Sequence, residues 1–202
     1  MSNSVPIFIL LGGKSQRMGT DKALLQWGEQ TLLRRTLEIA TALSDEIYLL
    51  TPWRDRYQPY LSTTVHWLDD PAQQGGLVAL NQGLKILKRQ GWVLLLACDL
   101  PKLDQGQLEQ WLKQLAAIPT NYTAALVNQG QFYEPCCGFY RNTAQTSLQQ
   151  FIDQGGRSFQ KWLATVPVFS LAIANPAMLF NCNTPADFAT LKTQPPSQQT
   201  ID

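Results

Sequence analysis

One stretch rich in glycine and in fixed charge, Leu10–Lys22 (LLGGKSQRMGTDK), holds the residue types that bind phosphate. It follows an apolar run, Val5–Leu11, that predicts a buried strand, and it precedes a helical pattern that begins near Thr31. Glycines let backbone N–H groups approach an anion, and lysine or arginine side chains add positive charge. The pattern is typical of a phosphate-binding loop at the carboxyl end of a sheet strand. The residues that would form it include Gly12, Gly13, Lys14, Arg17, Gly19 and Lys22.

Acidic residues follow two other predicted strands. Asp69 and Asp70 come directly after Val65–Leu68, and Asp99 follows the wholly apolar run Trp92–Ala97. A carboxylate at such a strand end can hold Mg²⁺, which prefers oxygen ligands and bridges phosphates. From the residues alone two interpretations stay open, because the glycine-rich stretch could be an ordinary surface turn and Asp99 a turn or cap residue.

Strand and helix patterns alternate along the first 118 residues, which predicts an α/β fold with a doubly wound, mostly parallel sheet in three αβα layers. The last predicted helix has Thr184 at its N-cap and Pro185 at its first position. The predicted strands are Val5–Leu11, Glu46–Leu50, Val65–Leu68, Trp92–Ala97, Thr123–Val127, Cys137–Tyr140 and Val166–Leu171. The predicted helices are Thr31–Leu43, Leu77–Gln90, Asp104–Ala116, Asn142–Asp153 and Ser158–Leu163, and the segment Asn181–Lys192 contains the start of the last one.

Length, charge and cysteine content narrow the classes of protein to which this chain can belong. The 202 residues, 45% of them hydrophobic, predict a single domain over residues 1–192 and a disordered tail over residues 193–202. A net charge of +1 and the lack of a long apolar run argue against nucleic-acid and membrane partners. The four cysteines form no CxxC pair and there is one histidine, so we expect reduced thiols in a cytoplasmic protein and no zinc site.

The segment GGKSQRMGTDK closely resembles the signature GGxSxRMGxDK of the molybdenum cofactor guanylyltransferases, the MobA family, within the wider nucleotidyltransferases. Leu11 departs from the family pattern, which usually has alanine there. Cys98-Asp99-Leu100-Pro101 is similar to the family's CDxP motif, and Asn181–Pro185 is similar to its NxNTP motif. Gly75-Gly76-Leu77 matches a GPLAG-type turn imperfectly. The resemblance implies a Rossmann-like nucleotidyltransferase fold.

The resemblance also assigns roles to individual residues. It implies that Asp99 holds Mg²⁺ and that Arg17, Lys22 and Asp99 are catalytic. Asp69 is the match for the family's nucleotide-binding aspartate, with Asp70 as the alternative. The implied nucleotide-binding residues are Leu10, Leu11, Gly12, Gly13, Lys22, Asp69, Gly76 and Asp99. Arg157, Asn181 and Asn183 would bind the pterin, and Glu134–Cys137 would face the same acceptor side.

The activity implied is transfer of GMP from GTP to molybdopterin or its molybdenum-bearing form, with release of pyrophosphate. GTP and molybdopterin are then the substrates, with transient contact to molybdenum-insertion or molybdoenzyme partners. Gly12 favours GTP over CTP and ATP, since guanine-using members have glycine there and a missing Cβ leaves room for a purine. Cytidylyl transfer, nucleotidyl transfer to a sugar phosphate, and a non-catalytic nucleotide-binding regulator are the alternatives.

Overall fold

A computed structural model of the chain describes residues 4–12, 21–61, 63–68, 74–87 and 90–194. Its strands are β1 (Ile7–Leu10), β2 (Gln26–Trp27), β3 (Gln30–Thr31), β4 (Ile47–Leu50), β5 (His66–Leu68), β6 (Trp92–Ala97), β7 (Ala124–Asn128), β8 (Tyr133–Arg141) and β9 (Val168–Ser170). Its α-helices are α1 (Leu32–Leu43), α2 (Arg54–Tyr57), α3 (Gly76–Ile86), α4 (Gln105–Gln114), α5 (Ala144–Asp153), α6 (Phe159–Leu163) and α7 (Pro185–Lys192). The described residues also form the 3₁₀ helices η1 (Lys22–Leu24), η2 (Gln58–Tyr60), η3 (Leu115–Ala117) and η4 (Pro176–Leu179).

Seven strands form one sheet in the order β5-β4-β1-β6-β8-β7-β9. Strands β5, β4, β1 and β6 pair in parallel, β7 pairs in parallel with β9, and β8 runs antiparallel to its neighbours β6 and β7. The predicted doubly wound, mostly parallel α/β fold is therefore confirmed. The chain order reverses beside β1, between β4 and β6, which is the position where such sheets bind ligands.

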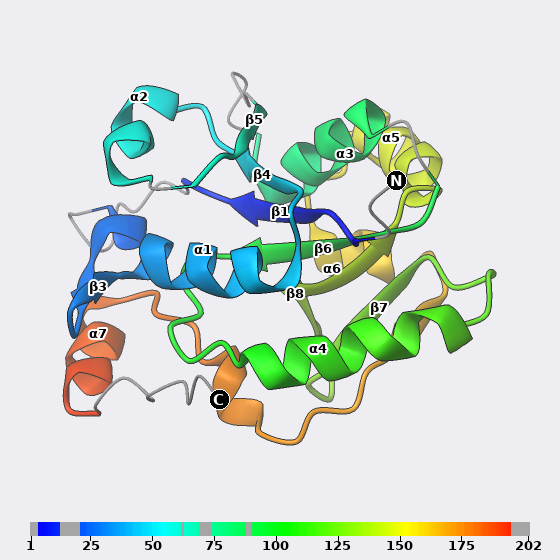
Figure 1. Cartoon of the computed structure of the whole chain (residues 1–202). Coiled ribbons are helices and arrows are strands. Elements are labelled where there is room, and N and C mark those ends of the chain that lie inside the picture. The colour runs from blue at the N-terminus through cyan, green and yellow to red at the C-terminus, as the bar shows by residue number, and fades with distance from the viewer. Residues whose placement is uncertain (1–3, 13–20, 62, 69–73, 88–89, 195–202) are drawn as a thin grey trace.

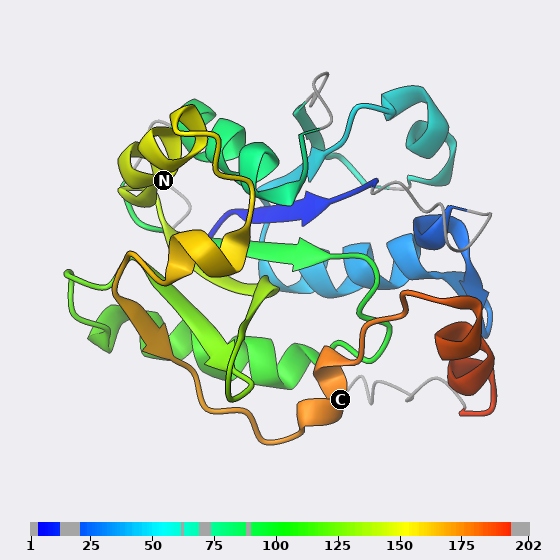
Figure 2. The ribbon, with the colours of Figure 1, turned by 180° about the vertical axis from the view of Figure 1, so that it is seen from behind.

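Both faces of the sheet are covered, as the apolar strands predict. Along β1, Ile7 and Ile9 pack into one core cluster with α1 and α4, whereas Phe8 packs into a second cluster with α3, α5 and α6. Helices α1 and α4 lie in front of the sheet in Figure 1. Figure 2 shows the opposite side, with α6, coloured gold, in front of the strands. The sheet is thus the middle of three layers, and it holds the ends of β1 and β6 in a fixed position.

The short hairpin of β2 and β3 has no counterpart in the sequence prediction, because two-residue strands carry no periodicity. It packs against α7 through a third cluster that contains Trp27, Cys182 and Leu191. Both views place the blue hairpin beside the red α7 (Figures 1 and 2). This packing brings the C-terminal helix to the same end of the molecule as η1, which begins at Lys22.

Several predicted boundaries differ from the structure. Helix α3 ends at Ile86 rather than Gln90, and residues 88–89 lie outside the described part of the chain. Strand β8 begins at Tyr133, before the predicted Cys137, and Pro135 lies on it near a register shift in its pairing with β7. Proline is tolerated at such irregularities. The domain limit at 192 and the tail stay predictions. None of the helices in the described ranges has the length and apolar character that crossing a bilayer requires.

The packing of α3 on β1 gives a stability prediction. A Cβ on Gly83 would lie 2.4 Å from Cε2 of the buried Phe8 ring, so Gly83→Ala is expected to destabilise the fold by about 1–3 kcal/mol through overpacking. Gly106 in α4 is the matched control, since its added Cβ meets nothing closer than Asp104 Oδ1 at 3.4 Å. Chemical denaturation should show Gly106→Ala unchanged or up to about 1 kcal/mol more stable. Equal stability of the two variants would contradict this packing.

Candidate active site

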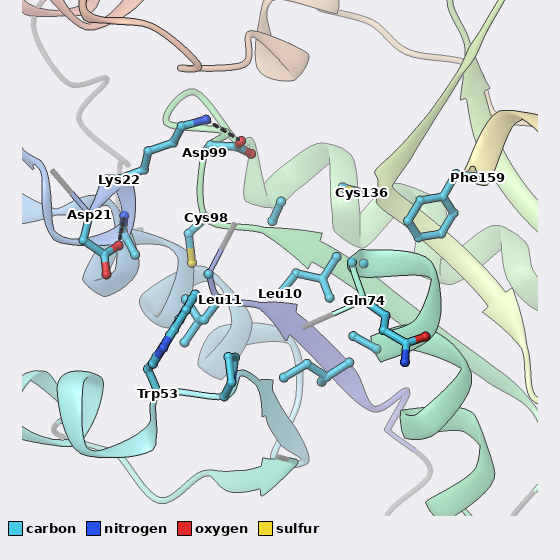
Figure 3. Close-up of a pocket in the computed structure, with 18 residues that line it drawn as sticks. Leu10, Leu11, Asp21, Lys22, Trp53, Gln74, Cys98, Asp99, Cys136 and Phe159 are labelled. Carbon is cyan, nitrogen blue, oxygen red and sulfur yellow. Dashed lines mark hydrogen bonds and ion pairs between the residues drawn. The ribbon is translucent and has the colours of Figure 1, made fainter. Parts of the chain in front are cut away.

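A cavity of about 660 Å³ opens at the carboxyl ends of β1, β4 and β6 (Figure 3). Lys22 is the only cationic side chain among the described residues that line it, and Asp21 and Asp99 are the acidic ones. The other lining residues that Figure 3 labels are Leu10, Leu11, Trp53, Gln74, Cys98, Cys136 and Phe159. The cavity therefore combines one positive charge, two carboxylates and aromatic walls, a set suited to a ligand with both phosphate and flat rings.

The ammonium group of Lys22 lies between two segments that are far apart in sequence. Its Nζ is 3.7 Å from Asp99 Oδ2 and donates a hydrogen bond of 2.5 Å to Asn183 Oδ1. Asn183 is 161 positions further along the chain. The structure thus brings together three predicted site residues from the first turn after the loop, the end of β6 and the segment before α7. Figure 3 shows the Lys22–Asp99 contact.

Asp21 positions Lys22 through the backbone. Its Oδ1 accepts a hydrogen bond from Ala23 N at 3.1 Å and so caps η1, the turn on which Lys22 lies. Its Oδ2 accepts hydrogen bonds from the Tyr57 hydroxyl at 2.8 Å and from Arg56 Nη1 at 3.1 Å. Asp21 therefore anchors the start of η1 to α2, which fixes the point from which the Lys22 side chain extends.

Asp99 lies at the end of the central strand β6 and belongs to the cavity wall. Its backbone carbonyl accepts a hydrogen bond of 2.8 Å from Cys182 N, which ties the C-terminal segment to this strand end. Burial raises the pKa of the Asp99 carboxyl, and the Lys22 ammonium acts in the opposite direction. The Asp99 side chain is one quarter exposed, and the residue lines the cavity.

Gly12 follows β1 with a φ of 97°, a conformation that favours glycine. A Cβ added to it would lie 2.1 Å from Cζ3 of Trp53. A side chain here would therefore overlap the Trp53 indole, which gives a packing reason for glycine, and the preference for a purine stays a prediction. Arg56 lies over the indole at 4.9 Å from its centroid, so Trp53 forms a supported wall of the cavity.

Leu10 and Gly76 form the opposite wall. A Cβ on Gly76 would lie 3.0 Å from Leu10 Cδ1 and 3.2 Å from Phe159 Cε2, so these three residues are close together. Gly76 begins α3, which has no side-chain cap at its N-terminus. Leu11 lines the cavity too, but it is 1% exposed and packs into the core. Its larger side chain thus fills the core beneath the cavity.

The two asparagines of the NxNTP segment lie on either side of the buried Cys182. Asn183 contacts Lys22, as described, and Asn181 Nδ2 donates a hydrogen bond to Glu134 Oε2 at 3.3 Å. The predicted cap of α7 is confirmed, because Thr184 and Asp187 form a reciprocal capping box. Capping uses the side chain of Thr184, so neither asparagine side chain is needed for the cap.

Arg157 is not among the residues that line the cavity. Its Nη1 donates hydrogen bonds to the carbonyls of Ile152 at 2.9 Å and Gly156 at 2.7 Å. These bonds connect Arg157 to the end of α5 and to the turn that follows it. Its predicted role in pterin binding stays a prediction. Three other predicted site residues, Gly13, Arg17 and Asp69, lie outside the described residues, as do Lys14, Gly19 and Asp70.

The sequence interpretation missed Trp53 and Phe159 as parts of the cavity wall, and it gave no individual role to Glu134. Trp53 follows β4 by three residues, so its strand-end position was the available signal. Glu134 is 7% exposed, and burial raises the pKa of its carboxyl. An acid beside a proline in a largely apolar segment was the signal for that residue.

Comparison with known proteins gives a consistent group. The family model described as MobA-like NTP transferase domain matches residues 7–167. A Nostoc protein named "Probable molybdenum cofactor guanylyltransferase" is 43% identical over 190 residues, which cover 94% of this chain and 91% of that protein. A Pseudomonas putida protein named "Molybdenum cofactor guanylyltransferase" is 34% identical over 184 residues, which cover 89% of this chain and 93% of that protein.

Among solved structures, the molybdopterin-guanine dinucleotide biosynthesis protein A of Archaeoglobus fulgidus has the same fold, with a TM-score of 0.78 at 19% identity over 94% of this chain and 97% of that one. A Mycobacterium tuberculosis protein, solved as a complex with manganese, superposes with a TM-score of 0.64 at 19% identity. It covers 95% of this chain and 100% of its own.

The burial of Asp99 gives a pH-dependent stability prediction. A carboxyl whose pKa is higher in the folded than in the unfolded state makes folding less favourable as the pH rises through that range. This loss of folding free energy is complete at pH values above the folded-state pKa, and it is absent at pH values below the unfolded-state pKa. Asp99→Asn is therefore expected to raise the melting temperature at pH 7–8, with the gain lost near pH 3. Thermal unfolding at both pH values measures this.

The control is Asp104→Asn, because Asp104 caps α4 through a hydrogen bond of 2.7 Å from Gln107 N, and asparagine caps equally well. It should leave the melting temperature unchanged at pH 7–8. A lower melting temperature for Asp99→Asn at neutral pH would show that contacts of the ionised carboxylate outweigh its burial.

Proposed function

This chain belongs to the family of MobA-like NTP transferases, and on that premise we propose that it transfers GMP from GTP to molybdopterin or its molybdenum-bearing form. The product is the guanine dinucleotide form of the cofactor, and pyrophosphate is released. The single observation that carries the proposal is the Lys22 ammonium between Asp99 and Asn183. It links the residue that the family assigns to phosphate with the segment assigned to the pterin.

The reaction needs no protein nucleophile. An oxygen of the acceptor's terminal phosphate attacks the α-phosphorus of GTP in line, a new P–O bond forms, and the bond to the β-phosphate's bridging oxygen breaks. Negative charge then accumulates around the α-phosphorus and on the departing pyrophosphate. A fixed cation at that point stabilises the transition state, and the remaining catalysis is positioning. Lys22 supplies that charge, and its anchors on Asp99 and Asn183 hold it in place.

We also propose that the reaction uses a divalent cation, Mg²⁺. Bound Mg²⁺ would neutralise charge on the triphosphate. Asp99 fits this role because it carries a carboxylate and lines the cavity. Among the described residues no three metal-ligating side chains gather, which suits an ion that arrives with the nucleotide's phosphates. The manganese complex of the M. tuberculosis structure supports a divalent ion in this fold.

The nucleotide and the pterin take opposite sides of Lys22 in this proposal. Gly12, Trp53 and the N-terminus of α3 at Gly76 surround the nucleotide side, where the helix N-terminus supplies backbone N–H groups. Asn181 and Asn183 serve the pterin side. Transient contact with molybdenum-insertion or molybdoenzyme proteins remains part of the proposal. So does a cytoplasmic location, which the four free thiols support.

The direct test is pyrophosphate release from Mg²⁺, molybdopterin and one nucleotide at a time. GTP is expected to react at least about tenfold faster than CTP or ATP, since the wrong base leaves buried polar groups unpaired. Asp99→Asn should lower the GTP rate roughly a hundredfold, the scale of losing a major electrostatic group, whereas Asp104→Asn should retain it.

Faster reaction with CTP would refute guanylyl transfer and favour the cytidylyl alternative. Release of pyrophosphate without a pterin, or with a sugar phosphate in its place, would assign a different acceptor. Undiminished turnover of Asp99→Asn at limiting Mg²⁺ would remove Asp99 from the metal site.

A further inference from the structure

The segment between η4 and α7 carries two asparagines, which are not among the residues that line the cavity but contact Glu134 and the cavity residue Lys22. Cys182 between them is fully buried and its N–H donates to the Asp99 carbonyl at 2.8 Å, whereas Asn181 is partly exposed and Asn183 exposed. The two amides are held by different parts of the chain, Asn181 by Glu134 and Asn183 by Lys22, and their orientations decide which polar atoms a ligand meets.

The amide of Asn181 is held with its nitrogen inward. Nδ2 donates to Glu134 Oε2 at 3.3 Å and to the Leu179 carbonyl at 3.2 Å, which uses both of its hydrogens. An ionised carboxylate can only accept hydrogen bonds, so Glu134 excludes the flipped amide. No described residue donates to Asn181 Oδ1. The atom left for a ligand is therefore an acceptor.

The amide of Asn183 is held the other way. Its Oδ1 accepts the 2.5 Å hydrogen bond from Lys22 Nζ, and an ammonium group can only donate. Among the described residues nothing accepts from Asn183 Nδ2. The atom that Asn183 leaves for a ligand is therefore a donor. A negative and a positive side chain thus fix the two amides in opposite orientations.

Glu134 is well placed to act as such an anchor. It comes from β8, is 7% exposed, and its Oε1 accepts a hydrogen bond of 3.2 Å from Cys136 N. Gln129 Nε2 donates a further bond of 3.3 Å to Oε2. Every described partner of this carboxylate is a hydrogen-bond donor. Oε1 accepts from the backbone of β8, and Oε2 accepts from Asn181.

We propose that Glu134 is a positioning residue for the acceptor substrate and that the asparagine pair reads a flat heterocycle edge carrying a donor next to an acceptor. The edge of a pterin, with its ring N–H or amino group beside a carbonyl, has this chemistry. The donor of the ligand meets Asn181 Oδ1, and its carbonyl meets Asn183 Nδ2. The inference rests on the proposed function, because the pterin is the acceptor named there.

The variant Glu134→Gln separates polarity from size. If the new amide oxygen keeps the bond from Cys136 N, its nitrogen faces Asn181 and repels Nδ2. The Asn181 amide then turns, and its NH₂ group meets the ligand's donor. Glu134→Asp is shorter but keeps two acceptor oxygens. If Glu134 acts as a hydrogen-bond acceptor, the isosteric Glu134→Gln should impair molybdopterin binding more than Glu134→Asp. If Glu134 acts only by filling space, the shorter Glu134→Asp should impair it more.

The experiment is equilibrium binding of molybdopterin, and separately of GTP, measured by calorimetry on the full chain. Glu134→Gln is expected to weaken the binding of molybdopterin roughly ten- to a hundredfold, because a buried hydrogen-bonding group loses its partner. Its affinity for GTP should stay within about twofold of wild type. Glu134→Asp should bind molybdopterin more tightly than Glu134→Gln. Gln129→Ala, which removes another bond to Glu134 without touching Asn181, should stay within about threefold of wild type for both.

The inference would be overturned if Glu134→Gln bound molybdopterin with wild-type affinity, or if it lost GTP affinity to the same extent. It would also be overturned if Glu134→Asp bound molybdopterin more weakly than Glu134→Gln. Because binding is measured without turnover, the two proposals separate. A wild-type chain that binds molybdopterin through Glu134 but releases no pyrophosphate would contradict the proposed function alone. A wild-type chain that binds no pterin would contradict both.

Discussion

The proposed site depends on one shared cation. The Lys22 ammonium contacts Asp99 and Asn183 in a partly buried setting. These three residues come from the turn after β1, the end of β6 and the segment before α7. Each lies where it does because a different part of the fold holds it. Disturbing any of those parts would separate charged groups that the proposed reaction uses together.

Three supports hold that cluster. The parallel pairing of β1 with β6 sets the strand ends side by side, and both strands are buried on both faces. Asp21 caps η1 and anchors it to α2. The hairpin of β2 and β3 packs on α7, and the Cys182 N–H bond to Asp99 fastens the segment before that helix. The hydrophobic core therefore does most of the positioning, and a few directed hydrogen bonds set the final geometry.

Sequence reasoning succeeded where the signal is local. The apolar run Trp92–Ala97 is strand β6, and Thr184 and Pro185 mark the start of α7. It failed where a residue's role depends on distant packing. The contact of Lys22 with Asn183 spans 161 positions and requires the docking of α7, which no local pattern encodes. The filling of the space beside Gly12 by Trp53 likewise follows from how the β1 and β4 strand ends lie together.

A double-mutant cycle on Lys22 and Asn183 tests most directly whether the cluster acts as one unit. The measurement is kcat/KM for molybdopterin at saturating GTP in wild type, Lys22→Ala, Asn183→Ala and the double variant. Residues in direct contact show coupling of about 0.5–3 kcal/mol, so the double variant should lose less than the sum of the single losses. Losses that add to within about 0.3 kcal/mol would mean that the two side chains act independently, and the account of a shared cation would be wrong.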